Sequence, residues 1–254
     1  MKDNVTKFKE SKIHLDLKGI DARIVYHRYD DVELNTTLVS FGEKRKVLST
    51  VDGLKQVKFV ANTYVPMDLA NKTMTIKKHQ QFMRRLPHTL GLYPKEITFT
   101  CTAVNMEKMA VCERSYQDFK VTCLATGGAK DNALRMGVDV GNWVEKKTGF
   151  QCASGTINVI ILTNVVLTVG AMARAIMTAT EAKTAALQDR GVRSTASPQL
   201  QATGTGTDSM IVVSGVDAGT VIRHTGGHTK MGELIGVTTK IAVAEALEKH
   251  DGPL

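Results

Sequence analysis

One stretch of the chain, residues 155–208, limits the fold more than any other. Near its start is Ile157–Val166, a run that is mostly β-branched and is bounded on its N-terminal side by Gly155. Such a run predicts a strand that is buried on both faces. It is too short to span a bilayer, and Asn158 and Asn164 interrupt it. The core of the protein is therefore expected to form around a central buried strand.

A long helix and a turn of small residues follow this strand. Thr168 is a suitable N-cap, Val169–Arg190 is the best helical segment of the chain, and Gly191 ends it. The sequence ATGTGTD then leads into a second apolar run, Ser209–Ser214. A turn of small residues leaves backbone N–H groups open to an anion or a developing oxyanion. This turn is where we expect the chemistry.

Composition describes an ordinary soluble globular protein. Of the 254 residues, 43% are apolar and 23% are charged, and no linker or low-complexity stretch divides them. The first residues, 1–18, are strongly charged, which argues against a secretory signal and favours a cytoplasmic location. The net charge is +8, but the basic residues are scattered and aromatics are only 5%, so no nucleic-acid partner is predicted. We expect one domain, 1–254, and a homodimer as the default assembly.

The rest of the chain consists mainly of short strand signals. Strands are predicted at 12–17, 22–26, 36–41, 46–48, 57–61, 97–102, 110–114 and 119–125, and near the C-terminus at 210–214 and 220–223. Residues 73–90 predict a helix that stops before Pro87, and the segment 126–137 predicts a Gly-rich loop that opens a helical piece.

The second long helix is expected to start at His228. Its buried stripe would hold Leu234, Val237, Ile241, Ala244 and Leu247. The fold class is thus α+β, with mixed or antiparallel sheets and two long helices packed outside them, a layered α/β sandwich. A single sheet with helices on one face is the rival arrangement.

The helix at 169–190 carries two residues that attract attention. At 100° per residue, Glu181 and Lys183 point to nearly opposite sides. Glu181 is as well explained by a solvated surface as by a site. Lys183 lies on a stripe with Met172, Ile176, Thr180 and Leu187, so it either extends outward or places its amine in a pocket.

Three further residue types have a structural interpretation beside the functional one. Asp208 ends the Gly/Thr turn, where an aspartate commonly caps the turn, or else faces a ligand. His224 and His228 are four residues apart, the spacing of a metal-binding pair on one face of a helix. Gly226 and Gly227 lie between them and argue against a helix there, so a metal pair is not predicted. The four cysteines show no CxxC pairing and are expected to be buried, reduced thiols, so no metal site is predicted.

The order of four motifs resembles one known family. GTINVIILTN, TATEAKTAAL, ATGTGTD and GGHTKMGELIG are similar, in that order, to sequences of the adenosylcobinamide amidohydrolases of cobamide salvage. The resemblance covers about Leu48–Leu247, leaving 1–47 as a less family-like N-terminal β region.

The resemblance implies hydrolysis of the amide that joins aminopropanol to the corrin ring of adenosylcobinamide. Adenosylcobyric acid and 1-amino-2-propanol would be the products, and cobalt would enter only as part of the corrinoid substrate, with no other cofactor. Within this interpretation the catalytic candidates are Glu181, Lys183, Asp208 and His228. Candidates for substrate binding are Asn132, Asn158, Thr180, Gly204, Thr205, Gly206 and Thr207.

Amide hydrolysis needs a base for water, donors for the oxyanion and an acid for the leaving amine. Glu181 or Asp208 is the hypothetical base, the backbone of residues 204–207 the oxyanion donor, and His228 or Lys183 the acid. No serine or cysteine nucleophile signature accompanies them.

Three other functions compete with this hypothesis. A non-catalytic corrinoid carrier or sensor would keep the pocket, although the set Glu181, Lys183, Asp208 and His228 exceeds what binding needs. A metal-dependent hydrolase would require His224, His228 and Asp208 to converge, and a nucleic-acid binder rests on charge alone.

Overall fold

A computed structural model describes residues 9–73, 75–141 and 155–253 of the protein. Its strands are β1 (Lys9–Ile13), β2 (Ile20–Tyr29), β3 (Val32–Ser49), β4 (Gly53–Tyr64), β5 (Ile97–Thr102), β6 (Ala110–Tyr116), β7 (Phe119–Gly127), β8 (Ala133–Leu134), β9 (Ile157–Thr163), β10 (Val165–Leu167), β11 (Gly204–Thr205), β12 (Ser209–Val213) and β13 (Asp217–Ile222). The helices are α1 (Met67–Lys72), α2 (Ile76–Thr89), α3 (Val169–Asp189) and α4 (Lys230–Asp251), with 3₁₀ turns η1 (Pro94–Glu96) and η2 (Met106–Lys108).

Nine of these strands form one continuous sheet that doubles back on itself at β3. The first part of β3 pairs with β2 and β4, and its last residues, Val47–Ser49, pair with β12. The register with β4 shifts between Ser40 and Arg45, which marks a bulge where the strand bends. One layer therefore contains β1, β2, β5 and the adjoining parts of β3 and β4, while the other runs through β12, β9, β7 and β6. Most pairings are antiparallel, and β4–β5 and β9–β12 are parallel.

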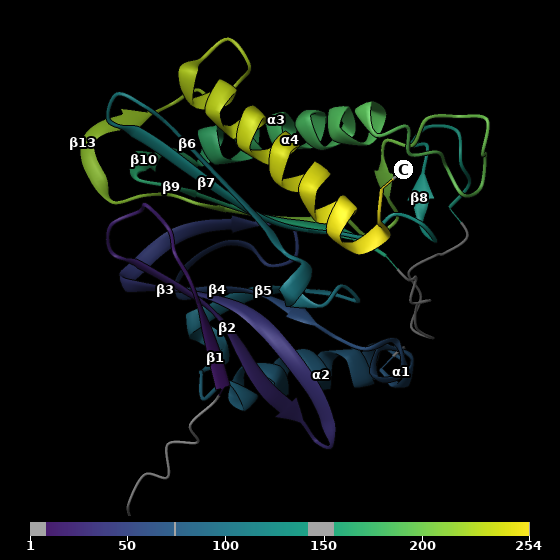
Figure 1. The fold of residues 1–254 in the computed structure, drawn as a ribbon. Coiled ribbons are helices and arrows are strands. Elements are labelled where there is room, and N and C mark those ends of the chain that lie inside the picture. Colours follow the sequence, from purple (N-terminus) through teal and green to yellow (C-terminus); the bar gives the residue numbers. More distant parts are fainter. Residues whose placement is uncertain (1–8, 74, 142–154, 254) are drawn as a thin grey trace, which may run out of the picture.

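Three apolar cores hold the layers together. The middle core joins side chains from both sheet layers, among them Val39, Val60, Ile160 and Ile211. A second core lies between β6, β7, β9, β12 and the pair α3 and α4, and a third between β2–β5 and α1 and α2. Figure 1 shows α3 and α4 together on one outer face and α1 and α2 on the other. The predicted layered α+β sandwich with outer helices is confirmed. The rival arrangement is right that the main strands form one sheet, but wrong in placing the helices on one face.

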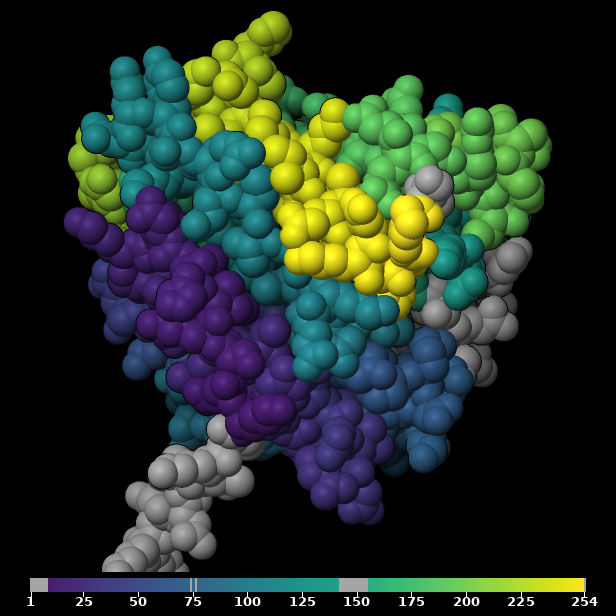
Figure 2. Space-filling view, viewed as in Figure 1, coloured from purple at the N-terminus to yellow at the C-terminus, as the bar shows by residue number. Residues whose placement is uncertain are grey.

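The space-filling view agrees with this arrangement. The N-terminal strands occupy the lower half of Figure 2, and α4 lies across the upper half. Of the helices the structure describes, none has the length and apolar character needed to cross a membrane.

The buried central strand is confirmed, but it is shorter than predicted. Every residue of β9 is buried, with alternate side chains in the two cores on its faces. The run breaks at Asn164, whose side chain accepts from Lys120 N (2.8 Å) and donates to Asp118 O (2.7 Å). These bonds take the place of a regular ladder, so the chain turns into the separate strand β10. In β3 the opposite happened, since the strands predicted at 36–41 and 46–48 are one bent strand.

Helix α3 agrees closely with its prediction. Thr168 is the N-cap, and its hydroxyl accepts a hydrogen bond from Ala171 N (3.2 Å). The helix ends at Asp189, and Gly191 follows with φ +65°, a conformation that favours glycine.

The predicted end of the helix before Pro87 is wrong. Helix α2 continues through Pro87 to Thr89 because Leu86 and Leu90 bury their side chains against the sheet and hold the last turn. Pro87 has no N–H to donate to the preceding turn, and the burial of these two leucines outweighs that lost hydrogen bond; Gly91, at φ +71°, then ends the helix.

The helical piece predicted in 126–137 is also wrong. Here β7 runs into a turn and the short strand β8, which pairs with β11. Both glycines lie close to α4: a Cβ added at Gly127 would be 3.1 Å from Leu247, and one added at Gly128 would be 2.8 Å from His250. The two glycines therefore serve close packing and do not open a helix.

The final helix begins two residues later than predicted. Thr229, not His228, is the N-cap of α4, and its hydroxyl accepts from Gly232 N (3.0 Å). The predicted stripe is partly wrong, because Val237 and Ile241 are exposed at 40% and 38%. The buried face instead includes Thr238 and Thr239, which hydropathy alone does not mark as core residues; the hydroxyl of Thr238 donates to Leu234 O (2.8 Å) inside its own helix.

Candidate active site

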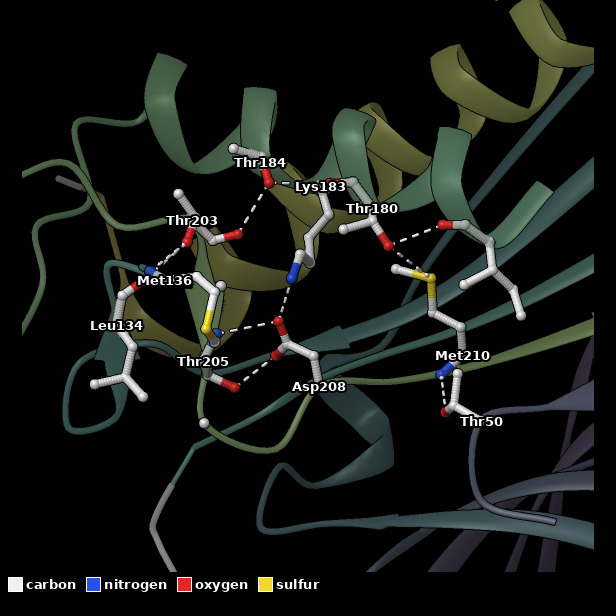
Figure 3. Close-up of a pocket in the computed structure, with 13 residues that line it drawn as sticks. Thr50, Leu134, Met136, Thr180, Lys183, Thr184, Thr203, Thr205, Asp208 and Met210 are labelled. Atoms are coloured by element: carbon white, nitrogen blue, oxygen red, sulfur yellow. Dashed lines mark hydrogen bonds and ion pairs between the residues drawn. The ribbon is translucent and has the colours of Figure 1, made fainter. Parts of the chain in front are cut away.

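A cavity of about 420 Å³ lies between α3, the turn 203–208 and the segment after β8. It holds several of the predicted residues, and Figure 3 shows their side chains converging on it. The lining residues are Thr50, Leu134, Met136, Ile176, Thr180, Lys183, Thr184, Thr203, Gly204, Thr205, Gly206, Asp208 and Met210.

Lys183 enters the cavity from α3. Lys183 is only 5% exposed, and its Nζ forms an ion pair with Oδ2 of Asp208. The sequence left open whether this lysine extends outward or into a pocket, and the structure places it in the pocket. Glu181, on the other side of the helix, is exposed to solvent and does not line the cavity.

Asp208 is surrounded by hydrogen-bond donors. Its Oδ1 accepts from Ile157 N (3.0 Å) and from the hydroxyl of Thr205 (2.5 Å). Its Oδ2 accepts from Thr205 N (3.0 Å) and from Lys183. A carboxylate has about four lone-pair sites, so these four donors satisfy it. These bonds fix the orientation of the carboxyl group, and charge-assisted bonds of this kind are the strong ones.

Gly204 makes room for the ion pair. A Cβ at this position would lie 2.5 Å from Nζ of Lys183 and 2.6 Å from Oδ2 of Asp208. No side chain fits there without moving the pair. The glycine is therefore required by space, since its backbone lies in β11 and pairs with Leu134.

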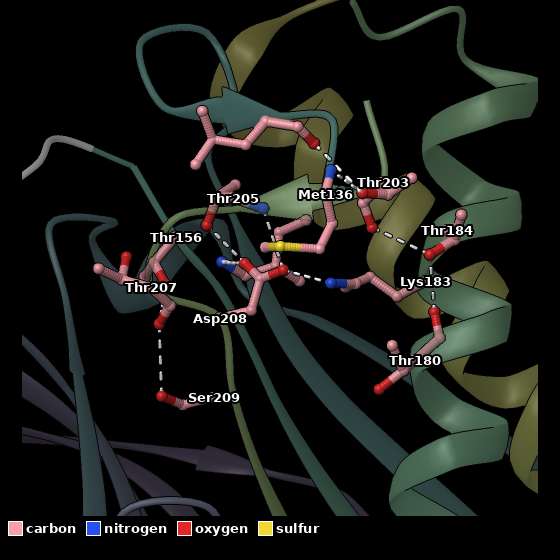
Figure 4. A network of polar contacts seen from close by, with 12 residues as sticks. Met136, Thr156, Thr180, Lys183, Thr184, Thr203, Thr205, Thr207, Asp208 and Ser209 are labelled. Atoms are coloured by element: carbon pink, nitrogen blue, oxygen red, sulfur yellow. Dashed lines mark hydrogen bonds and ion pairs between the residues drawn. The ribbon is translucent and has the colours of Figure 1, made fainter. Parts of the chain in front are cut away.

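A network of polar contacts holds the turn 203–208 in place, and Figure 4 shows the part of it around Thr205, Thr207 and Asp208. The side-chain amide of Asn132 donates to Gly155 O (2.9 Å), and the backbone carbonyl of Asn132 accepts from Gly206 N (3.2 Å). The carbonyl of Thr207 accepts from the hydroxyl of Thr156 (2.9 Å). Asn132 and Thr207 thus hold the turn in place, and neither lines the cavity.

Two other predicted residues lie away from the cavity. Asn158 is 1% exposed inside the sandwich, where its amide donates to Asn62 Oδ1 and Cys101 O, both at 2.9 Å. It links β9 with β4 and β5 and has no contact with the pocket. His228 is exposed in the turn before α4, beside Gly226, which faces Arg174 on α3. The structure does not bring His228 together with Lys183 and Asp208.

No metal centre is evident among the residues that the structure describes. They contain no group of three or more His, Cys, Asp and Glu side chains arranged to hold an ion. Burial raises the pKa of Cys101 and of Cys123 to about 12, so both remain thiols at neutral pH. Cys152 lies outside the described residues.

Several lining residues were not predicted. Thr184 follows Thr180 by one helical turn and was within reach of a periodicity argument. Met136 and Thr203 come from segments 67 residues apart, where the Thr203 hydroxyl accepts from Met136 N (2.9 Å). Only the pairing of β8 with β11 brings these two segments together, and no local sequence signal announces it.

Comparison with known proteins assigns the chain to a family. The sequence profile described as adenosylcobinamide amidohydrolase matches residues 20–253. The chain belongs to the adenosylcobinamide amidohydrolase family. The predicted resemblance is confirmed, and the chain is accordingly a hydrolase of an amide-cleaving family.

Relatives within and near this family differ in what is known of them. An uncharacterised protein of Methanocaldococcus jannaschii is 42% identical over 229 residues, covering 86% of this chain and 88% of its own length. A protein of Methanosarcina mazei named adenosylcobinamide amidohydrolase is 29% identical over 177 residues, covering 69% of this chain and 72% of its own. A solved structure of a Pyrococcus horikoshii protein aligns over 91% of this chain and 84% of its own, with 11% identity and a TM-score of 0.46, too distant a likeness to bear on the site.

Proposed function

We propose that the protein hydrolyses the amide bond that joins 1-amino-2-propanol to the corrin of adenosylcobinamide. The products are adenosylcobyric acid and 1-amino-2-propanol. The role is salvage, in which scavenged cobinamide is returned to cobamide assembly. The membership of the family supports the substrate, and the named relative from Methanosarcina mazei supports the reaction.

One observation carries the proposal: the buried ion pair of Lys183 and Asp208 faces the cavity. Burying two charges is costly, and a pair of this kind is weak as a means of stabilising a fold. A pocket that only binds a neutral arm of a corrinoid has no need of it. An enzyme that stabilises a developing charge does need it, because a fixed ammonium in a water-poor site acts strongly on an oxyanion.

The dimensions of the cavity indicate which part of the substrate enters. About 420 Å³ accommodates the aminopropanol arm and the amide, whereas the macrocycle is far larger and must lie across the mouth. Met136, whose residue is 72% exposed, and the half-buried Ile176 offer apolar surface at that mouth. The amide carbonyl then lies near the ammonium of Lys183.

The distribution of hydrogen-bond donors supports one assignment of catalytic roles within this proposal. The N–H groups of Thr203, Thr205 and Gly206 already donate to Leu134 O, Asp208 and Asn132 O, which removes most of the turn as an oxyanion hole. Lys183 supplies the oxyanion donor, since an ammonium has three N–H bonds and one goes to Asp208. Glu181 and His228 have no direct part in it.

The remaining features of the proposal follow from the sequence expectations. The enzyme acts as a single domain in the cytoplasm, takes cobalt only with its substrate and needs no added metal or cofactor. A homodimer is the default assembly.

The decisive test is release of 1-amino-2-propanol, followed by mass spectrometry, when the purified protein is incubated with adenosylcobinamide. Release without added metal that persists in chelator is expected. Loss of activity in chelator, restored by a metal ion, would replace the metal-free mechanism. Binding seen in the corrin absorbance without any release would replace the enzyme with a corrinoid carrier.

A further inference from the structure

The cavity is lined by five threonines, and only one of them is hydrogen-bonded to an ionisable group. Thr180 and Thr184 donate to backbone carbonyl oxygens of Ile176, Thr180 and Thr203. Thr203 donates to Leu134 O, and Thr50 accepts from Met210 N. The hydroxyl of Thr205 alone donates to a carboxylate, Oδ1 of Asp208, at 2.5 Å. Both close-up views show these two side chains directed toward each other.

The four donors around Asp208 have a mechanistic consequence. A carboxylate that acts as base toward water must accept a hydrogen bond from that water, and Asp208 has no lone-pair site left for one. Two of its donors are backbone N–H groups, which do not give up a proton. Of its two side-chain donors, the ammonium of Lys183 is the charge partner of the carboxylate, so the proton that Asp208 is placed to take belongs to the hydroxyl of Thr205.

We infer that Thr205 is the nucleophile of the reaction and that hydrolysis passes through a covalent acyl-enzyme; this rests on the proposed amidohydrolase activity. Oγ1 of Thr205 attacks the amide carbonyl carbon while its proton passes to Oδ1 of Asp208. The C–N bond then breaks, and the amine leaves with the proton from Asp208. The corrin carboxyl remains as an ester of Thr205, and a water molecule hydrolyses it to the acid and restores the hydroxyl. Amide and water are consumed, and acid and amine are formed.

The ion pair with Lys183 fits this step electrostatically. When Asp208 takes the proton it becomes neutral, and at that moment the negative charge appears on the substrate oxygen. The ammonium of Lys183 exchanges one anionic partner for another, so the net charge of the buried site does not change. Direct attack by water would give the ammonium no such exchange, because Asp208 cannot contact that water.

The test compares three variants and adds a competing nucleophile. Thr205→Val removes the hydroxyl at nearly constant volume, and Thr205→Ser retains it. Thr178→Val is the matched control: Thr178 is also 6% exposed, and its hydroxyl bonds only Thr225 O, outside the cavity. Each variant is checked for folding by its thermal midpoint. Adenosylcobinamide turnover is then measured with and without hydroxylamine, which would convert a corrin ester into a hydroxamate.

Thr205→Val is expected to lower kcat by about 1,000-fold or more, the cost of one lost active-site group. Thr205→Ser should keep at least about one hundredth of the parent kcat, and Thr178→Val should remain within a few fold of the parent protein. With hydroxylamine the parent should yield corrin hydroxamate while aminopropanol release is not slowed.

A folded Thr205→Val variant with kcat within tenfold of the parent overturns the inference. So does a parent enzyme that releases aminopropanol but yields only cobyric acid in hydroxylamine, since the hydroxyl would then act without a covalent step. Absence of aminopropanol from the parent itself is a different failure, because it removes the proposed activity and the inference with it.

Discussion

At the scale of single residues, the site depends on the space around Lys183 and Asp208 as much as on their charges. The ion pair is nearly buried, with the two side chains exposed at 7% and 13%. A pair this deep tolerates little displacement, because a separated buried charge is expensive. Gly204 is the residue that leaves the pair its room.

Gly204→Ala is therefore expected to reduce kcat by about 100-fold although no functional group is removed, in line with the sensitivity of catalysis to displacements near 1 Å. Amide turnover of the folded variant is the measurement. Gly170→Ala on α3, where an added Cβ meets nothing within 4 Å, is the control and should remain active. Equal activity of the two variants would show that the pair has more freedom than its packing indicates.

A second residue-scale prediction concerns the acid stability of the fold. His27 is 5% exposed, its ring nitrogens bond the hydroxyls of Thr36 and Thr89, and burial lowers its pKa from 6.5 to about 4. Between about pH 6.5 and 4, His27 is therefore protonated in the unfolded chain and mostly neutral in the folded protein. The free energy of unfolding should fall as the pH drops through this window, by up to about 3 kcal/mol from this group.

Urea unfolding of the parent protein and of His27→Gln between pH 4 and 7.5 measures this effect. The variant should lose part of the pH dependence, since an amide keeps hydrogen-bonding capacity but does not titrate. An unchanged slope would assign the acid sensitivity to other groups, of which His250 and His79 also have pKa values lowered by burial.

At the scale of elements, the site is formed where two short strands meet the side of a long helix. β8 and β11 contain two residues each, yet their pairing joins the mouth of the cavity to its base. Asp139 holds the segment after β8 by accepting from Arg135 N and from the hydroxyls of Ser194 and Ser197, at 2.5–2.6 Å. These bonds lower the pKa of Asp139, so the segment stays fixed at neutral pH.

Met136 lies on this fixed segment and should contact the corrin macrocycle in the proposed complex. Met136→Asp is expected to raise KM by about tenfold with kcat within threefold, because apolar contact made equally in ground and transition states affects binding alone. Steady-state kinetics with adenosylcobinamide check this. Val216→Asp, an exposed valine outside the cavity lining, is the control. A fall in kcat without a change in KM would contradict the placement of the macrocycle at this mouth.

At the scale of the whole molecule, β3 joins the two sheet layers into one structure. Its ends belong to different layers, and the middle core packs residues from both. Cys101 packs against the core beneath α1 and α2, and Cys123 lies in the core beneath α3 and α4. The reactivity of the two thiols therefore measures the opening of the two sheet layers separately.

Both thiols are expected to react with a neutral-pH thiol reagent at least about 1,000-fold more slowly than in the unfolded chain. Their opening free energies should agree within about 1 kcal/mol if the layers unfold together. Labelling followed by peptide mass spectrometry provides both numbers, with the denatured protein as reference. Much faster labelling of Cys101 alone would mean that the N-terminal layer opens independently.

The extent of successful prediction follows from how local each signal is. The buried strand at 157–163, the cap at Thr168 and the helix to Asp189 were predictable because periodicity and capping act within a few residues. The final helix was predicted, but its buried face was only partly predicted, because Thr238 and Thr239 are buried although threonine is not strongly hydrophobic. The end of α2 was missed because burial of Leu86 and Leu90 outweighs the effect of Pro87.

The candidate site divides in the same way. Sequence alone named candidates for the reactive groups, and it correctly placed Glu181 and Lys183 on opposite sides of one helix, because that angle is a property of the helix itself. Only the tertiary structure decided that Lys183 turns inward to Asp208, that Glu181 and His228 stay outside, and that Asn158 serves the interior. The reason is physical: the ion pair, the β8–β11 pairing and the space at Gly204 join segments far apart in the chain, and their geometry exists only once the layers have packed.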